Sequence, residues 1–189
     1  AWYGVVTDEA LPLEERDDAA KQLETFADSG NQYAQYLTGI LYRDGGLLIP
    51  DTEKAQHYLE LAARQDHASA QYALGKLFLS DDPEVQNPAQ GLYWLERAVQ
   101  NGSDYAAYRL GKEYLSGKSA PKNPERAAEY VRMAAEWGNP YAQYLLGKLY
   151  LSGDGVPQDK DAAYEWFQKA QAQGHDYAGF FVDRIERPE

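Results

Sequence analysis

The chain has 189 residues, of which 44% are hydrophobic and 25% are charged, as is usual for a folded domain or a short array of repeats. A net charge of −12 argues against non-specific binding to nucleic acid and against adhesion to anionic membranes. Because the chain has no cysteine, disulfides, thiolate nucleophiles and cysteine-ligated metals are excluded.

The first 12 residues are predicted to form an acidic N-terminal tail. Residues 1–30 hold eight acidic and two basic side chains, which is half of the negative excess of the chain. The opening has no basic lead and no long apolar stretch, and no apolar run approaches the roughly 18 residues of a membrane-spanning helix. We therefore expect no signal peptide, which leaves the compartment open and slightly favours the cytoplasm. The missing initiator Met is consistent with processing or with a piece of a longer protein.

From residue 13 onward the chain repeats itself every 36 residues. The most regular stretch reads YAQYLLGKLYLSG at residues 141–153, and related strings begin at residues 33, 69, 105 and 177. The small residues that mark the period are Ala34, Ala70, Ala106, Ala142 and Ala178, together with Gly39, Gly75, Gly111 and Gly147. Aromatic residues keep the same step at Tyr36, Tyr72, Tyr108, Tyr144 and Phe180. A motif repeated at a fixed spacing indicates a building unit that stacks on its neighbours.

Each repeat is predicted to contain two helices joined by a loop. The first spans about Gln32 to Arg43, where apolar residues follow helical spacing. The second begins after an Asp or Asn that can cap its free N–H groups, at Asp51, Asn87, Asn123 and Asp159. It ends near a glycine in most repeats, at Gly102, Gly138 and Gly174.

This pattern divides the chain into a half repeat, four full repeats and another half repeat. The predicted boundaries are 13–29 for the first half repeat, 30–65, 66–101, 102–137 and 138–173 for the full repeats, and 174–186 for the last half repeat. Residues 187–189 are a tail. The expected fold is all-α, a right-handed superhelical solenoid of about ten helices in which residues 13–186 form a single domain.

The pattern A-x-Y-x-L-G-x-x-Y, followed by a G-x-G-V-P-x-D-like loop, an A-x-x-W stretch and a closing A-A-x-x-G, resembles the Sel1-like repeat family. Residues 142–174 match it best, and the resemblance covers roughly residues 13–186. It implies a solenoid related to tetratricopeptide arrays and a role as an adaptor or scaffold. Thr38, Arg109 and the glycine-free loop 80–87 depart from the motif, which concerns local packing. The sequence motif AQYxLGKLYLSG also looks like repeat regions of bacterial mobilisation (relaxase) proteins.

Two sets of equivalent residues on the first helices are the candidate partner-binding residues. A basic ladder consists of Lys76, Lys112, Lys148 and Arg184, and an aromatic ladder consists of Tyr33, Tyr105, Tyr141 and Tyr177. Their offset of seven residues places both ladders on one side of the helix. Packed helices lie about 10 Å apart and an extended peptide advances about 3.3 Å per residue, so every third peptide residue can meet a rung. The alternative is that these are consensus residues, with tyrosines packed between repeats and lysines solvated.

Other motifs have structural explanations. His67 and His175 occupy a helix-capping position, and neither they nor His57 are expected to bind a metal or act in catalysis. Ser119 and Lys122 match the S-x-x-K motif of penicillin-recognising enzymes, but Pro121 and a predicted loop separate them. Residues 153–165 lack the oxygen-ligand order of a calcium loop and instead predict a turn capped by Asp159.

The expected function is therefore a protein–protein interaction scaffold that binds an acidic or aromatic partner segment on its concave face. No enzyme activity, cofactor, metal, direct nucleic-acid contact or membrane contact is expected. The acidic stretch DEALPLEERDD is a solvated helix entry or, alternatively, an occupant of the basic ladder of its own or a neighbouring molecule. A hydrolase of cell-wall-related substrates, similar to a β-lactamase, and a structural spacer within a larger mobilisation protein are the alternative functions.

Overall fold

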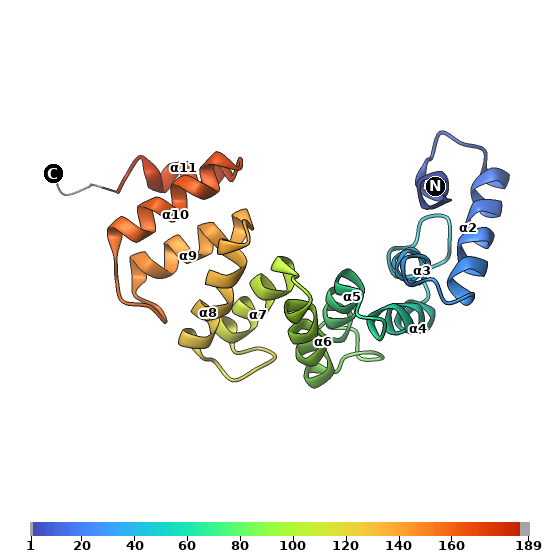
Figure 1. Cartoon of the computed structure of the whole chain (residues 1–189), viewed down its shortest axis with the longest axis horizontal. Coiled ribbons are helices and arrows are strands. Elements are labelled where there is room, and N and C mark those ends of the chain that lie inside the picture. The colour runs from blue at the N-terminus through green and yellow to red at the C-terminus, as the bar shows by residue number, and fades with distance from the viewer. Residues whose placement is uncertain (1, 186–189) are drawn as a thin grey trace. The chain divides into compact units, whose positions relative to one another are not determined.

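The computed structural model describes residues 2–185, and this part of the chain is α-helical without strands (Figure 1). The described helices are α1 (Trp2–Thr7), α2 (Leu13–Asp28), α3 (Gln32–Asp44), α4 (Thr52–Ala63), α5 (Ala68–Phe78), α6 (Pro88–Gln100), α7 (Asp104–Ser116), α8 (Pro124–Glu136), α9 (Pro140–Ser152), α10 (Lys160–Ala172) and α11 (Asp176–Val182). The predicted all-α solenoid of helix–turn–helix repeats is confirmed. The tail predicted at residues 187–189 lies outside the described residues.

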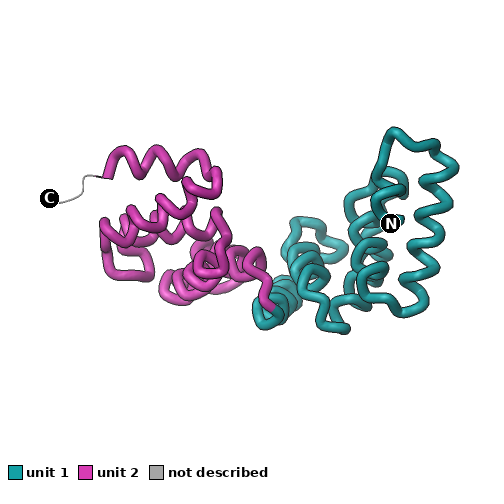
Figure 2. The backbone as a smooth tube through the Cα atoms, turned by 45° about the horizontal axis from the view of Figure 1, so that its top comes forward, with its two compact units in different colours: residues 1–101 teal, residues 102–189 magenta. Residues whose placement is uncertain are grey.

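The chain forms two compact units, residues 1–101 and residues 102–189 (Figure 2). The first unit contains α1 to α6 and the second contains α7 to α11. Within each unit, helices that are consecutive in sequence pack against each other. The predicted repeat boundaries, and the interpretation of residues 13–186 as one domain, stay predictions.

Helix α1 lies inside the segment described above as an acidic tail, and the sequence pattern did not reveal it. Val6 is only 1% exposed and belongs to the core that α2, α3 and α4 share. Val6 is 36 residues before Tyr42, whose carbonyl accepts the backbone N–H of Asp51 at 2.9 Å. The Val6 carbonyl instead accepts Arg16 Nε at 3.0 Å. Helix α1 thus corresponds, 36 residues earlier, to the last turns of α3, the first helix of the next repeat.

The caps follow the predicted chemistry. Side-chain oxygens of Asp51, Asn87, Asn123 and Asp159 each accept a backbone N–H three residues later, at 2.9–3.2 Å. Gly102, Gly138 and Gly174 follow the second helices with positive φ, as predicted. Asp66 takes this place after α4 with a φ of 61°, and its carboxylate accepts Arg97 Nη2 at 2.6 Å. An ion pair therefore accompanies a backbone conformation that elsewhere requires glycine.

A pair of glutamines ties the turn after a second helix to the first helix of the same repeat. Gln35 Nε2 donates to the Ala27 carbonyl at 3.1 Å, and its oxygen accepts Gln65 Nε2 at 2.7 Å. Gln143 and Gln173 make the same contact at 2.8 Å in the second unit. These glutamine side chains therefore link neighbouring helices of the stack through hydrogen bonds.

Tyrosine hydroxyls join α2 to α3 and α4 in the first unit. Tyr42 donates to Glu24 at 2.9 Å, and Tyr58 donates to Asp28 at 2.9 Å. Burial, together with the hydrogen bond to Asp28, raises the pKa of the Tyr58 hydroxyl well above its ordinary value. The folded protein therefore holds this proton more tightly than the unfolded chain does.

We predict that the stability of the first unit falls as the pH rises above about 10, where an unfolded tyrosine begins to ionise. Because the pKa of Tyr58 is higher in the folded protein, its protonated hydroxyl stabilises the fold at lower pH. This contribution to the free energy of unfolding is lost as the pH rises toward the pKa of the folded state. Urea midpoints measured from pH 8 to pH 11 should fall more steeply for the wild type than for Tyr58→Phe. Parallel curves would show that Tyr58 is not the group responsible.

A second prediction concerns Gly155, in the loop before α10. Its φ is +69°, and a Cβ at this position would clash with the carbonyl oxygen of Pro124. Gly155→Ala should therefore lower the free energy of unfolding by about 2 kcal/mol or more, since strain and overlap add. Gly174→Ala is the matched control, because Gly174 has a φ of +81° but no neighbouring atom within 4 Å. It should cost only about 1 kcal/mol in urea unfolding, and equal losses would refute the packing argument.

Candidate partner-binding surface

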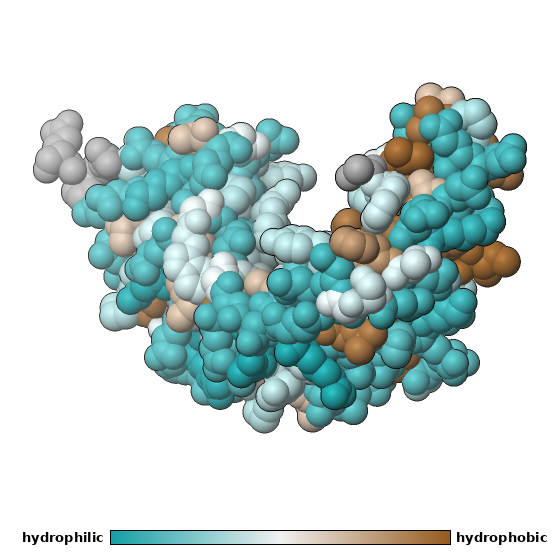
Figure 3. Space-filling model, turned by 45° about the vertical axis from the view of Figure 1, so that its right-hand side comes forward, coloured by the Kyte–Doolittle hydropathy of each residue, from teal (hydrophilic) through white to brown (hydrophobic). Residues whose placement is uncertain are grey.

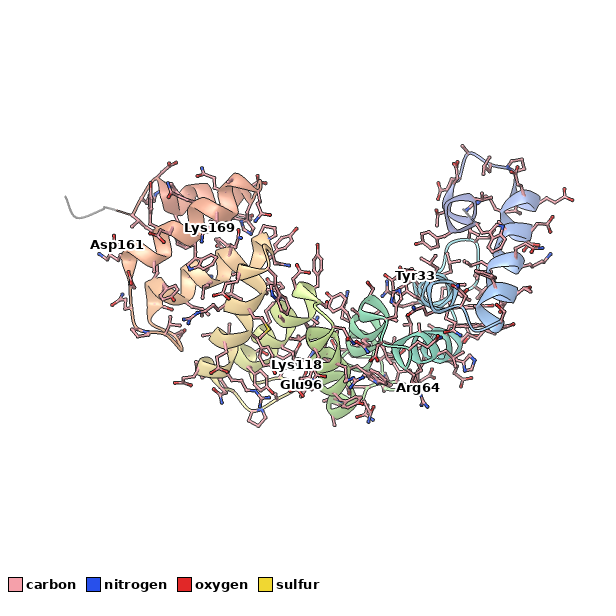
Figure 4. The ribbon with its side chains drawn as sticks, viewed as in Figure 1. Tyr33, Arg64, Glu96, Lys118, Asp161 and Lys169 are labelled. Carbon is pink, nitrogen blue, oxygen red and sulfur yellow. The ribbon has the colours of Figure 1, made fainter. Side chains whose placement is uncertain are left out.

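Seven of the eight predicted partner-binding residues lie on first helices, and Arg184 lies in the turn after α11. Tyr33 and Lys76 belong to the first unit, and Figure 4 marks Tyr33 near the start of α3. The remaining six residues belong to the second unit: Tyr105, Lys112, Tyr141, Lys148, Tyr177 and Arg184. The four tyrosines are 52–73% exposed, and the four basic side chains are also exposed. That all eight residues form one continuous partner-binding surface stays a prediction.

Each basic residue of the ladder lies over an aromatic ring one helical turn earlier. Lys112 Nζ is 5.6 Å from the Tyr108 ring, and Lys148 Nζ is 5.8 Å from the Tyr144 ring. Lys76 lies 5.4 Å from Tyr72 and the Arg184 guanidinium 3.5 Å from Phe180. Sequence reasoning found the period of these rings without assigning them to the surface, although the i, i+4 spacing signals such a contact.

The first helices α7 and α9 of the second unit enclose two adjoining pockets, of about 440 Å³ and about 330 Å³. Both are lined by Leu115, Leu145 and Lys148. We call this surface the α7–α9 trough, and its other lining residues are Tyr108, Lys112, Ser116, Lys122, Pro124, Tyr144, Leu149, Ser152 and Asp154. Apolar side chains and lysines thus line the same recess. Burial raises the pKa of the Tyr108 hydroxyl, which stays protonated at neutral pH.

Two tyrosines of the aromatic ladder, Tyr141 and Tyr177, lie close to aromatic rings or to His175. The Tyr141 ring lies 6.3 Å from Tyr108 and 5.6 Å from His175, while His175 stacks on Tyr144 at 4.4 Å. Tyr141, His175 and Tyr177 also line a pocket of about 230 Å³. The structure therefore brings Lys112 and Lys148 together in the trough, and it brings Tyr141 and Tyr177 together at the starts of α9 and α11.

The two equivalent histidines differ in their contacts. His67 Nδ1 accepts the Ala70 N–H at 3.2 Å, as predicted for a cap of α5, and burial lowers the pKa of this imidazole. His175 stands at the same position before α11 but makes no side-chain capping bond. Both histidines thus occupy the N-cap position, as predicted, but only His67 makes the capping bond. The ring of His175 stacks on Tyr144 instead.

The remaining motifs fall where the sequence placed them. Ser119 and Lys122 lie in the loop between α7 and α8, and Asp159 caps α10 after the turn at Gly153 and Gly155. Within residues 2–185, no three His, Asp or Glu side chains gather as a metal site would require. Across the same residues, no helix has both the length and the apolar character needed to cross a membrane.

Comparison with known proteins identifies the repeat. The Sel1 repeat model matches residues 32–67, 68–103, 104–139 and 140–175, which begin two residues after the predicted repeats and keep their period. A search of curated proteins found no match. The narrower likeness to mobilisation proteins stays a prediction.

Solved structures of this fold come from several bacteria. The antigen c5321 of uropathogenic Escherichia coli is 31% identical over 84% of this chain and 34% of its own, with a TM-score of 0.79. A Sel1 repeat protein from Oxalobacter formigenes is 34% identical over 89% of this chain and 49% of its own, also with a TM-score of 0.79. The cysteine rich protein B of Helicobacter pylori is 24% identical over 69% of this chain and 94% of its own, with a TM-score of 0.57, and shares the fold.

The chain spans about a third and about a half of the lengths of the first two proteins. Proteins built from this repeat are generally non-catalytic scaffolds for protein interactions. Because four matches to the repeat model cover most of the sequence, the chain belongs to the Sel1 repeat family.

Proposed function

We propose that the chain is a scaffold that holds an acidic segment of a partner protein in the α7–α9 trough. The observation that carries the proposal is the joint lining of one recess by lysines and apolar side chains, with Lys148 and Leu145 in both of its pockets. In related helical repeats the first helices line the concave surface, and we propose that the trough opens on that surface here.

The two kinds of lining residue would contribute in different ways. Lys112 and Lys148 are exposed, so each ion pair with a partner carboxylate would add about 1 kcal/mol or less. Their main effect would be on the rate of association and on the choice of partner. Leu115, Leu145 and the Tyr108 ring offer apolar area that a partner side chain can bury, which is where most of the affinity would arise.

The spacing of the two lysines favours an extended segment. They occupy equivalent positions on first helices of successive repeats, about 10 Å apart by helix packing. Acidic residues three apart in an extended segment of polyproline II conformation would lie on the same side, about 9 Å apart. Apolar or aromatic residues between them would face Leu115 and Leu145.

The alternative functions rest on the sequence alone. A hydrolase would need the Ser119 hydroxyl activated by a base, and the described contacts of the loop between α7 and α8 give Ser119 no such partner among residues 2–185. A spacer would need no recess, whereas the trough is an accessible one. We therefore propose the scaffold and neither alternative.

We predict that Lys112→Glu combined with Lys148→Glu abolishes selection of acidic peptides. A display library of random 12-residue peptides, panned against the wild type, should yield Asp/Glu-rich sequences with apolar residues between the charges. Binding of the best peptide should weaken at least 30-fold in the double variant, since two attractive contacts become repulsive. Titration by fluorescence anisotropy gives the dissociation constants.

The matched control combines Lys21→Glu with Lys160→Glu. These exposed lysines lie outside the trough, and the control imposes the same change in net charge. It should bind the peptide within about threefold of the wild type. If both double variants bound the peptide equally weakly, the loss of affinity would be due to net charge, and the trough would be refuted as the binding site.

A further inference from the structure

The acidic segment between α1 and α2 has the features that the proposed function requires of a ligand. We call it the acidic linker: it reads DEALPLEE, covers residues 8–15 and runs from the end of α1 into the first turn of α2. Acidic residues stand at both ends, and Leu11, Pro12 and Leu13 lie between them. Where the chain passes from α1 to α2, the surface shows apolar residues in brown beside hydrophilic residues in teal (Figure 3). The α7–α9 trough is lined by the complementary groups, which are lysines and apolar side chains.

The side chains of the acidic linker are available for binding. Leu13 is 69% exposed. Glu9 and Glu14 are exposed too, and among residues 2–185 neither carboxylate accepts a hydrogen bond or forms an ion pair. Asp8 is engaged within the segment, since its Oδ1 accepts the Ala10 N–H at 3.0 Å. Glu9 and Glu14 can therefore pair with another molecule without losing an existing contact.

The backbone presents this segment in one conformation. The Leu11 N–H donates to the Asp8 carbonyl at 3.1 Å. Pro12 follows with a φ of −57° and a ψ of 144°, and α2 begins at the next residue. Because proline fixes its own φ and the turn is already formed, the segment loses little conformational freedom when it binds.

The equivalent loop of the next repeat lacks such available carboxylates. Residues 44–51 also place apolar residues between acidic ones, and Ile49 is 86% exposed. However, Asp44 forms an ion pair with Arg43 at 2.6 Å, and Asp51 caps α4 by accepting a backbone N–H at 2.9 Å. The acidic groups of this loop are therefore already engaged in the fold.

The other loops that join the two helices of a repeat differ further. Those before α6 and α10 bury their apolar residues Val85 and Val156, which are each 8% exposed. The loop before α8, residues 117–123, contains Lys118 and Lys122 and no acidic residue. Of the interhelical loops in the part of the chain that the structure describes, the acidic linker thus has the chemistry that best fits the trough.

The two units of the chain carry different charges, which favours contact between unlike parts of two molecules. The first unit holds seventeen acidic and seven basic residues, a net charge of −10, whereas the second unit is close to neutral at −2 with thirteen acidic and eleven basic residues. The acidic linker belongs to the first unit and the trough to the second. The lysines of the trough therefore meet an oppositely charged surface in the first unit of another copy, and low ionic strength strengthens this attraction.

We propose that the acidic linker of one chain occupies the α7–α9 trough of a second copy. Glu9 and Glu14 pair with Lys112 and Lys148, and Leu13 lies against the apolar lining of the trough. This inference rests on the proposed function, because it requires the trough to bind acidic segments. Each chain has one linker and one trough, so the contact joins unlike surfaces of the two copies. A copy bound in this way excludes the partner protein, so that the concentration of the chain regulates access to the trough.

The experiment is sedimentation equilibrium of the 189-residue chain at micromolar to submillimolar concentrations in about 50 mM salt. The weight-average mass of the wild type should rise above 21.3 kDa with concentration and should fall back when salt is added. Lys112→Glu with Lys148→Glu should weaken self-association at least tenfold, and so should Glu9→Lys with Glu14→Lys. An equimolar mixture of these two double variants should associate again, because each supplies a surface that complements the other. Both variants remain net negative, so overall charge cannot cause this recovery.

Two matched controls separate the linker from general effects. Glu53→Lys with Glu84→Lys makes the same charge change, again in the first turn of a helix and in an interhelical loop of the first unit, and should not weaken self-association. Leu13→Ser should weaken it at least fivefold, because an exposed apolar contact is lost. Ile49→Ser, at the equivalent position 36 residues later, should leave it unchanged. Unchanged circular dichroism of each variant confirms that it is folded.

Three results would overturn the proposal. The first is a wild type that stays monomeric while its trough still binds acidic library peptides, in which case the proposed function stands without this inference. The second is a monomeric wild type whose affinity for those peptides rises when Glu9 and Glu14 are changed to lysine, because the linker then occupies the trough of its own molecule. The third is self-association that both double variants leave intact. A trough that binds no acidic peptide at all overturns the proposed function itself.

Discussion

In each full repeat a glycine of the first helix faces an apolar side chain of the second helix with almost no space between them. A methyl group at Gly39, Gly75 or Gly147 would lie 2.8 Å from the facing Leu59, Leu95 or Phe167. This close approach buries the second-helix residue completely and fixes the distance between the two helices. The α7–α9 trough depends on it, because successive first helices are held in register by the second helix between them.

Most of the fold could be predicted from the sequence, because the signals that mark the ends of the helices are local and recur in every repeat. A capping Asp or Asn and a closing glycine each act within one turn of helix, so four copies in register leave little ambiguity. Helix α1 could not be predicted from the sequence, because six residues are too few to show a helical period. Its stability depends on the contact of Val6 with a core assembled from α2, α3 and α4.

The candidate site could be predicted only in part. The exposed tyrosines and lysines were visible as equivalent positions, but the trough also needs Leu115, Leu145 and Lys122. These residues come from two repeats, and a half-buried leucine has the same sequence signature as a core leucine. His175 shows the same limit, since its role depends on the ring of Tyr144, which lies 31 positions earlier in the chain.

Substitutions between repeats leave the glycine contact of the two helices in place, which explains how one framework can carry different surfaces. Gln35 pairs with Gln65, Gln71 with Asn101 and Gln143 with Gln173, whereas the third repeat has Ala107 and Trp137 at these positions. Its helix α7 likewise has Arg109 and Glu113, bonded at 2.7 Å, where α9 has Leu145 and Leu149. The third repeat keeps the close contact between Gly111 and Val131, so the helix spacing persists while other positions vary. The charges of −10 and −2 on the two units are a consequence of that freedom, since the period constrains only the residues that pack.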